Sequence, residues 1–147
     1  MASIQFIRGD ITADPSDVLV NTVNCAGVMG KGVAKAFADA FPTIVPPYKA
    51  ACRAGDIRPG TARIYAIPGD ADARCWAALA TKNHWRDPSQ YTWVETGLAD
   101  LAANARAIGA RSIAIPRPGC GNGGLSWDRV KPMLQTALAD FDVTVYL

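Results

Sequence analysis

The sequence predicts an α/β fold in three layers, with a mixed central sheet and helices on both faces. Strand and helix patterns alternate along the chain, which is typical of such folds. Two glycine-rich segments each follow an apolar strand and precede a helix, and such loops gather at the carboxyl ends of the strands in an open sheet. At 147 residues the chain is long enough to bury roughly 70% of its unfolded surface, so we expect one domain over residues 1–147.

The first elements in order are two strands and a helix. Residues 3–8 alternate between polar and apolar, as in a strand with one face in water. Residues 18–23 are more uniformly apolar and therefore belong nearer the centre of the sheet. Apolar residues then recur at helical spacing from Val33 to Phe41, and Pro42 ends that helix.

The middle of the chain predicts a connection, a hairpin and a long helix. Residues 41–60 are rich in proline and are interpreted as a connecting loop that carries a short helix at residues 45–54. Residues 61–67 and 76–81 are expected to form a hairpin across the turn PGDADAR. Residues 89–107 carry an apolar stripe at helical spacing and form an amphipathic helix.

The last third predicts two strands and one more helix. Residues 112–115 form a short central strand, which leads into the second glycine-rich loop at residues 119–124. Ser126 is the expected N-cap of a helix over residues 127–139, because serine side chains accept hydrogen bonds from the first turn. Residues 143–147 close the chain as a strand.

Composition and charge exclude several classes of protein. Half of the residues are apolar, 19% are charged and the net charge is +2, so the chain is neither disordered nor a non-specific polyanion binder. The four cysteines are widely spaced and form no CxxC pair, which argues against a zinc site and against a secreted disulfide framework. Cys25 and Cys120 flank the glycine-rich loops and are interpreted as small buried side chains, not nucleophiles.

The location of the protein follows from what its sequence lacks. The first ten residues, MASIQFIRGD, contain no basic segment followed by a long apolar run. No stretch approaches the roughly 18 apolar residues that a membrane span needs. We therefore expect a cytoplasmic monomer with reduced thiols, no membrane association, no cofactor and no metal.

The two glycine-rich loops predict a phosphate site. The first, VLVNTVNCAGVMGKGV at residues 18–33, runs from a strand through three glycines to a helix, where free N–H groups and the helix dipole attract anions. The second, at residues 118–125, has the same placement. Neither GxGxxG nor GxxxxGK[ST] occurs, which excludes the common dinucleotide and P-loop sites. Lys31 is either a phosphate contact or a solvated helix charge.

Three segments of the chain resemble the ADP-ribose-binding segments of the macrodomain family. They are Gly9-Asp10-Ile11, the run from Asn21 to Gly32, and the second loop PGCGNGG. The match runs in order over nearly the whole chain. Within the family, NTVNCAGVMGKGVAKAF, ATKNHWRDPS and YTWVETGL most resemble the branch that removes ADP-ribose from DNA. The resemblance implies a three-layer α/β/α macrodomain that binds ADP-ribose.

The resemblance also implies binding roles. Asp10 would accept a hydrogen bond from the adenine amino group beside the Ile11 backbone, Asn24 would bind the distal ribose, and Asn21 would line the same cleft. The structural alternatives are that Asp10 is a turn or capping aspartate and that both asparagines only satisfy loop backbone groups. The diphosphate would lie against Val28, Met29, Gly30, Lys31, Gly32 and Val33 of the first loop and Pro118, Gly119, Cys120, Gly121, Asn122, Gly123, Gly124 and Leu125 of the second.

Lys82 is the candidate catalytic residue. It follows the apolar strand WAALA, so the end of a sheet would aim its side chain into the cleft. In the glycohydrolases that the chain resembles, the lysine of this TK motif attacks the anomeric carbon of ADP-ribose or otherwise assists cleavage. An unprotonated amine would attack as a nucleophile, whereas an ammonium would stabilise charge on the departing base or the diphosphate. A solvated lysine near a turn is the structural alternative.

His84, Trp85 and Arg86 follow the candidate lysine and would form a wall for a modified nucleotide. An aromatic ring beside a cation suits one unstacked base and its phosphate, and stacking contributes ~1 to 3 kcal/mol per base. The alternative places Trp85 in the core and His84 on the surface.

Position 123 decides between two substrates. The resemblance to protein-directed relatives would place an aspartate there, but this chain has Gly123, as in the DNA-directed branch. We therefore expect hydrolysis of the N-glycosidic bond between ADP-ribose and a DNA base, with thymidine in single-stranded DNA as the expected nucleotide. The enzyme would reverse a DNA ADP-ribosyltransferase toxin, its expected cognate partner. A hydrolase for Glu- or Asp-linked ADP-ribose on proteins and a non-catalytic ADP-ribose reader are the alternatives.

Overall fold

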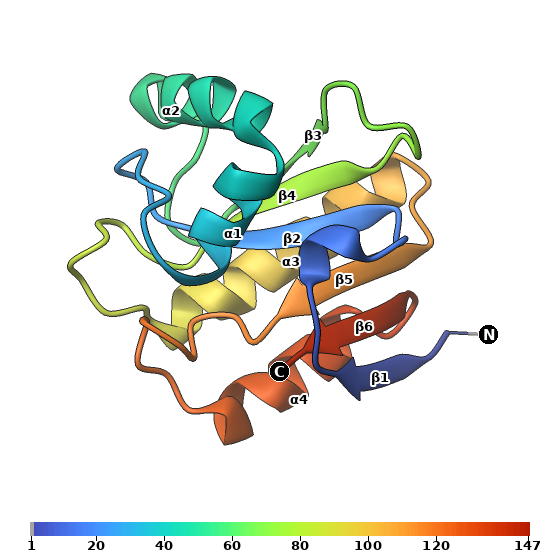
Figure 1. Cartoon of the computed structure of the whole chain (residues 1–147). Coiled ribbons are helices and arrows are strands. Elements are labelled where there is room, and N and C mark those ends of the chain that lie inside the picture. Colours follow the sequence, from blue (N-terminus) through green and yellow to red (C-terminus); the bar gives the residue numbers. More distant parts are fainter. Residues whose placement is uncertain (1) are drawn as a thin grey trace.

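The computed structural model describes residues 2–147 and contains one six-stranded sheet in the order β1-β6-β5-β2-β4-β3 (Figure 1). Five strands run parallel, while β3 pairs antiparallel with β4, which confirms the expected hairpin. The strands are β1 (Ile4–Ile7), β2 (Val18–Val23), β3 (Ala62–Ala66), β4 (Cys75–Ala80), β5 (Ser112–Pro116) and β6 (Asp142–Tyr146).

Four α-helices form the outer layers of the fold. One face of the sheet packs against α1 and α2, and the other packs against α3 and α4, which confirms the expected three layers. Two short 3-10 helices, η1 and η2, lie in the connections. The bounds are η1 (Ile11–Ala13), α1 (Gly32–Ala40), η2 (Pro42–Ile44), α2 (Val45–Ala54), α3 (Tyr91–Ala107) and α4 (Trp127–Ala137).

Strand β2 contributes to both hydrophobic clusters, which lie on opposite faces of the sheet. Its side chains alternate, so that Val18 and Val20 belong to the cluster under α3 and α4, while Leu19 and Val23 belong to the cluster under α1 and α2. All four are at most 3% exposed. A strand covered on both faces favours apolar residues, and four of the six residues of β2 are valine or leucine.

Helix α4 begins where it was expected and ends two residues early, at Ala137 instead of residue 139. Ser126 occupies the expected N-cap position, although its side chain makes no capping hydrogen bond. The backbone N–H of Ser126 donates to the Tyr91 hydroxyl at 3.0 Å.

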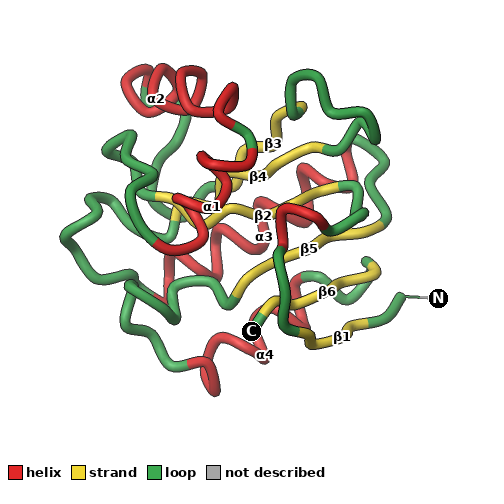
Figure 2. Tube along the Cα trace, in the orientation of Figure 1, coloured by secondary structure: helices red, strands yellow, loops and turns green. Residues whose placement is uncertain are grey.

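The carboxyl ends of three neighbouring parallel strands define one edge of the sheet. The loops after β2, β4 and β5 leave this edge side by side, at the left in Figures 1 and 2. Because parallel strands end together, segments from residues 24, 81 and 117 onward meet there despite their separation in sequence. Among residues 2–147, no helix has the length and apolar character of a membrane span.

Truncating one core side chain of α3 tests this packing. Leu98 is fully buried, so Leu98→Ala should lower the free energy of unfolding by about 2 to 5 kcal/mol through lost contacts and a residual cavity. Ile108, 54% exposed at the end of the same helix, provides the matched control, and Ile108→Ala should change stability by less than about 0.5 kcal/mol. Urea unfolding measures both variants, and equal losses would contradict the assigned core.

Candidate functional site

A cleft of about 1100 Å³ opens at this edge of the sheet. Its wall combines residues that follow β1, β2, β4 and β5 with the end of β6. The predicted residues that it brings together are Asp10, Ile11, Asn24, Val28, Gly30, Lys31, Gly32, Val33, Lys82, Trp85, Arg86, Gly119, Gly121, Asn122 and Gly123. The predicted residues that are not part of the wall are Asn21, Met29, His84, Pro118, Cys120, Gly124 and Leu125.

Asn21 lies beneath the cleft instead of on its wall. It is a residue of strand β2 with no exposed surface, and its Nδ2 lies 3.8 Å from the Met29 sulfur. The expectation that Asn21 lines the cleft is therefore wrong. Its side chain is fully buried within β2, whereas the next two residues of this strand, Thr22 and Val23, reach the wall. Leu125 is also turned inward, since it packs against the core cluster under α3 and α4.

Asn24 shapes the first loop. Its Oδ1 accepts hydrogen bonds from the backbone N–H groups of Ala26 and Val28 at 3.0 and 3.3 Å, and its Nδ2 donates to the Val28 carbonyl at 2.9 Å. The buried Tyr48 hydroxyl donates to the Asn24 carbonyl at 2.7 Å. Asn24 thus satisfies backbone groups of the loop, as the structural alternative stated, and it also lines the cleft. No local sequence signal marks Tyr48 as the support of this loop.

Cys25 joins the first loop to the segment that carries Lys82. Its backbone N–H donates to the Asn83 carbonyl at 3.0 Å, and its thiol lies 3.4 Å from the Lys82 carbonyl. Burial, together with the neighbouring Cys52, raises the pKa of the Cys25 thiol to about 12. Burial raises the pKa of Cys120 as well. Both thiols therefore stay protonated at neutral pH, although both side chains are half-buried and not buried as expected.

The second loop is closed by contacts between backbone atoms. Leu125 N–H donates to the Gly119 carbonyl at 2.9 Å, and Gly119 has φ +73°, a conformation that glycine adopts without strain. Ser89 N–H donates to the Gly123 carbonyl at 3.0 Å. A Cβ atom on Gly123 would lie 2.3 Å from Ser89 Oγ and 2.4 Å from the Gly119 oxygen. A side chain at position 123 would therefore point into the loop's own backbone.

Lys82 is held against the cleft wall and is not a solvated surface lysine. Its Nζ donates to the Asn122 carbonyl at 3.1 Å and to the Trp85 carbonyl at 3.4 Å. The first of these bonds ties the loop after β4 to the second glycine-rich loop. The amine therefore lies where the loop after β4 meets the second glycine-rich loop, and Lys82 lines the cleft.

Trp85 stands at the rim of the cleft. Its side chain is exposed at 43%, which rules out the core alternative. The guanidinium carbon of Arg86 lies 4.7 Å from the Trp85 ring centroid, and the His84 ring lies 5.2 Å away. His84 Nδ1 also accepts the Arg86 backbone N–H at 3.1 Å. His84 thus supports the loop, while Trp85 and Arg86 face the cleft.

The cleft wall is strongly cationic for a nearly neutral chain. It carries Lys31, Lys82, Arg86 and Arg117, but among residues 2–147 only one carboxylate, Asp10, lines it. Asp10 caps η1, since its Oδ1 accepts the backbone N–H and the hydroxyl of Thr12 at 2.9 and 2.6 Å. Such a surplus of positive charge in a concave site attracts anions. Within the described part of the chain, no group of three acidic, histidine or cysteine side chains is placed to hold a metal.

The wall also contains residues that were not expected from the sequence, and two of them, Arg117 and Tyr146, have large polar side chains. Arg117 directly precedes the second loop, so its position at the cleft could have been inferred from the sequence. Tyr146 comes from the last strand, and its hydroxyl donates to Asp14 at 2.6 Å. Only the pairing of β6 beside β1 brings it to the cleft.

Two alanine substitutions test the geometry of the second loop. Gly123→Ala should lower the free energy of unfolding by about 1 to 3 kcal/mol, because its Cβ cannot enter without moving the Gly119 backbone. Gly121→Ala is the matched control, because a Cβ there would meet no atom within 4 Å. Thermal and urea unfolding measure both, and an unchanged stability of Gly123→Ala would contradict the close approach.

Known proteins with related sequences share this architecture. The DNA ADP-ribosyl glycohydrolase of Thermus aquaticus is 44% identical over 135 residues, which cover 92% of this chain and 38% of the relative. The chain thus spans about two fifths of the length of the curated relatives it matches.

Solved structures match over the whole chain. The macrodomain of Mycobacterium tuberculosis DarG superposes with a TM-score of 0.94 at 36% identity, covering 99% of this chain and 98% of that one. Thermosipho africanus DarTG in complex with ADP-ribose superposes with a TM-score of 0.92 at 29% identity, covering all of this chain and 42% of that one. The Macro domain family matches residues 20–134. The chain therefore belongs to the macrodomain family.

Proposed function

We propose that this cleft binds ADP-ribose and releases it from a DNA base, with thymidine in single-stranded DNA as the modified nucleotide. The observation that carries the proposal is the position of Lys82, which lines the cleft and whose Nζ donates to the second glycine-rich loop at the Asn122 carbonyl. The similarity to a protein named DNA ADP-ribosyl glycohydrolase, and to one solved with ADP-ribose, supports both the ligand and the reaction.

The charges and loops of the cleft suit the parts of ADP-ribose. Adenine would lie beside Asp10, whose Oδ2 is not used by the bonds to Thr12. The diphosphate would lie between the loops that end at Gly32 and begin at Gly119, where backbone N–H groups and the cationic wall favour anions. The distal ribose would then reach Asn24 and Lys82, which places its anomeric carbon next to the amine.

Lys82 would act on the anomeric carbon in one of two ways. As a nucleophile, the Nζ lone pair forms a bond to this carbon while the glycosidic C–N bond breaks, and the base leaves with the electron pair and gains a proton. Water then displaces the lysine. As an ammonium, Lys82 would instead stabilise charge on the departing base while water attacks directly.

The absence of a second carboxylate near Lys82 favours the DNA substrate. Asp10, the one acid among residues 2–147 on the wall, belongs to the segment assigned to the adenine. An aspartate at position 123 would have its Cβ within 2.4 Å of Ser89 Oγ and the Gly119 oxygen, so this backbone has no room for it. The lysine-aspartate pair that the resemblance ascribes to protein-directed relatives therefore has no place for its acid in this loop.

The rim offers a surface for the modified base and its neighbours. Trp85 is exposed and lies under the Arg86 guanidinium, so an unstacked base can pack on the aromatic ring while the cation meets a phosphate. A DNA ADP-ribosyltransferase must supply the modified nucleotide, and such an enzyme is the partner that this activity would oppose.

A paired-substrate assay tests the proposal. The purified protein is incubated with a thymidine-ADP-ribosylated single-stranded oligonucleotide and with a glutamate-ADP-ribosylated protein, and gels with mass spectrometry follow release. We expect release from the DNA alone. Lys82→Ala should lower turnover by at least about 100-fold and keep ADP-ribose affinity within several-fold. Lys35→Ala is the matched control, because Lys35 pairs with Asp39 on α1 and is not part of the cleft wall.

Three outcomes would contradict this assignment. Release from protein alone would move the chain to the protein-directed activity, and tight binding without release would make it a reader of ADP-ribose. A wild-type rate for Lys82→Ala would remove the lysine from the reaction.

A reductive trap separates the two roles of Lys82. A nucleophilic lysine forms an imine once the sugar ring opens, and borohydride reduces that imine to a stable amine. Mass spectrometry of the wild-type protein should then show one ADP-ribose adduct on the peptide that contains Lys82. A full catalytic rate with no adduct under borohydride would favour the ammonium role.

A further inference from the structure

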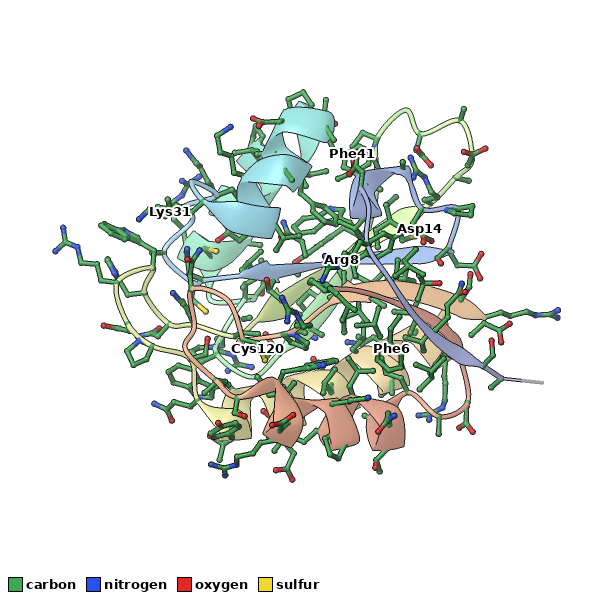
Figure 3. The ribbon with its side chains drawn as sticks, turned by 60° about the horizontal axis from the view of Figure 1, so that its bottom comes forward. Phe6, Arg8, Asp14, Lys31, Phe41 and Cys120 are labelled. Carbon is green, nitrogen blue, oxygen red and sulfur yellow. The ribbon has the colours of Figure 1, made fainter. Side chains whose placement is uncertain are left out.

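Arg74 connects three segments of the chain: the loop between β3 and β4, the turn η1 and the end of α1. It is the last residue before β4, and its side chain is only 12% exposed. Its Nε and Nη2 donate to the two carboxylate oxygens of Asp70 at 3.0 and 2.8 Å. Its guanidinium also lies 5.5 Å from the Phe41 ring centroid, at the end of α1. Figure 3 shows Asp14 and Phe41, two residues that Arg74 contacts, in the same region.

The remaining donors of Arg74 hold the turn η1. Nη1 donates to the carbonyls of Thr12 and Asp14 at 2.9 and 3.0 Å. These carbonyls lie at the end of the turn that begins with Asp10. Because Asp10 Oδ1 is bonded to Thr12, the orientation of the turn also sets the direction of the Asp10 carboxylate.

The same network reaches a second residue of the cleft wall. The buried Asp14 carboxylate accepts the Tyr146 hydroxyl at 2.6 Å through Oδ2 and the Ser16 backbone N–H at 2.8 Å through Oδ1. Tyr146 lines the cleft together with Asp10. Asp10 and Tyr146 are thus both hydrogen-bonded to the segment of residues 12–14, whose carbonyls accept hydrogen bonds from Arg74. Arg74 itself is not part of the wall.

We propose that Arg74 is a positioning residue for the purine end of the bound nucleotide, acting through η1 on Asp10 and Tyr146. This inference rests on the proposed function, because it takes the ligand to be ADP-ribose with adenine beside Asp10. Asp70 holds the guanidinium in place through two bonds, so that Nη1 faces the two carbonyls. The loop between β3 and β4 therefore determines how well the site distinguishes adenine from other bases.

Calorimetric titration of Arg74→Met with two ligands tests the proposal. Wild type should bind ADP-ribose roughly tenfold more tightly than inosine diphosphate ribose, whose purine carbonyl replaces the amino group that Asp10 accepts. Arg74→Met keeps a long apolar side chain but loses all side-chain donors, so this preference should fall to about twofold or less. Arg74→Lys should restore part of it. In the DNA assay, KM should rise while kcat stays unchanged.

Arg106→Met is the matched control. Arg106 also pairs with an aspartate, Asp140, and lies 5.6 Å from the centroid of a phenylalanine ring, yet it is remote from the cleft wall. It should keep the full preference for adenine. A preference retained in folded Arg74→Met would overturn the inference, and if that variant does not fold, a full preference in Arg74→Lys would do so. Failure of wild type to bind ADP-ribose would instead overturn the proposed function.

Discussion

The parallel pairing of β2 with β4 and β5 is the constraint on which this structure depends. Parallel strands end at the same edge, so the three loops that follow them must meet, although they are up to about 90 residues apart in sequence. The strands can hold this position because both faces of β2 are covered by apolar layers. The sheet thus brings two glycine-rich loops and Lys82 to one cleft.

The loops themselves are shaped by contacts that do not involve a ligand. Asn24 and Tyr48 fix the first loop, and the close approach of Gly119 and Gly123 closes the second. Lys82 then bonds the second loop to the segment after β4. A site whose backbone N–H groups are already in position loses little conformational entropy when an anion binds. The lysine therefore belongs to the scaffold of the cleft as well as to its proposed chemistry.

The sequence predicted the layers, the hairpin and nearly all element bounds, because periodicity and glycine placement are local properties. It also predicted the loops and Lys82, whose positions follow from strand ends. The prediction from the sequence failed where contacts between distant segments determine whether a side chain is buried or reaches the cleft. Asn21 was expected on the wall but is fully buried within the sheet. Arg74 and Tyr146 act through partners about 60 and 130 residues away, which no local pattern indicates.

The central claim is that ADP-ribose lies between the two glycine-rich loops with its distal ribose at Lys82. Amide NMR spectra of the labelled protein, recorded during titration with ADP-ribose, test this directly. We expect the largest amide chemical-shift changes at residues 28–33 and 119–125, with smaller changes at residues 10–11 and 82–86. Shifts confined to the outer faces of α2 or α4, or no saturable shifts at millimolar ligand, would contradict it.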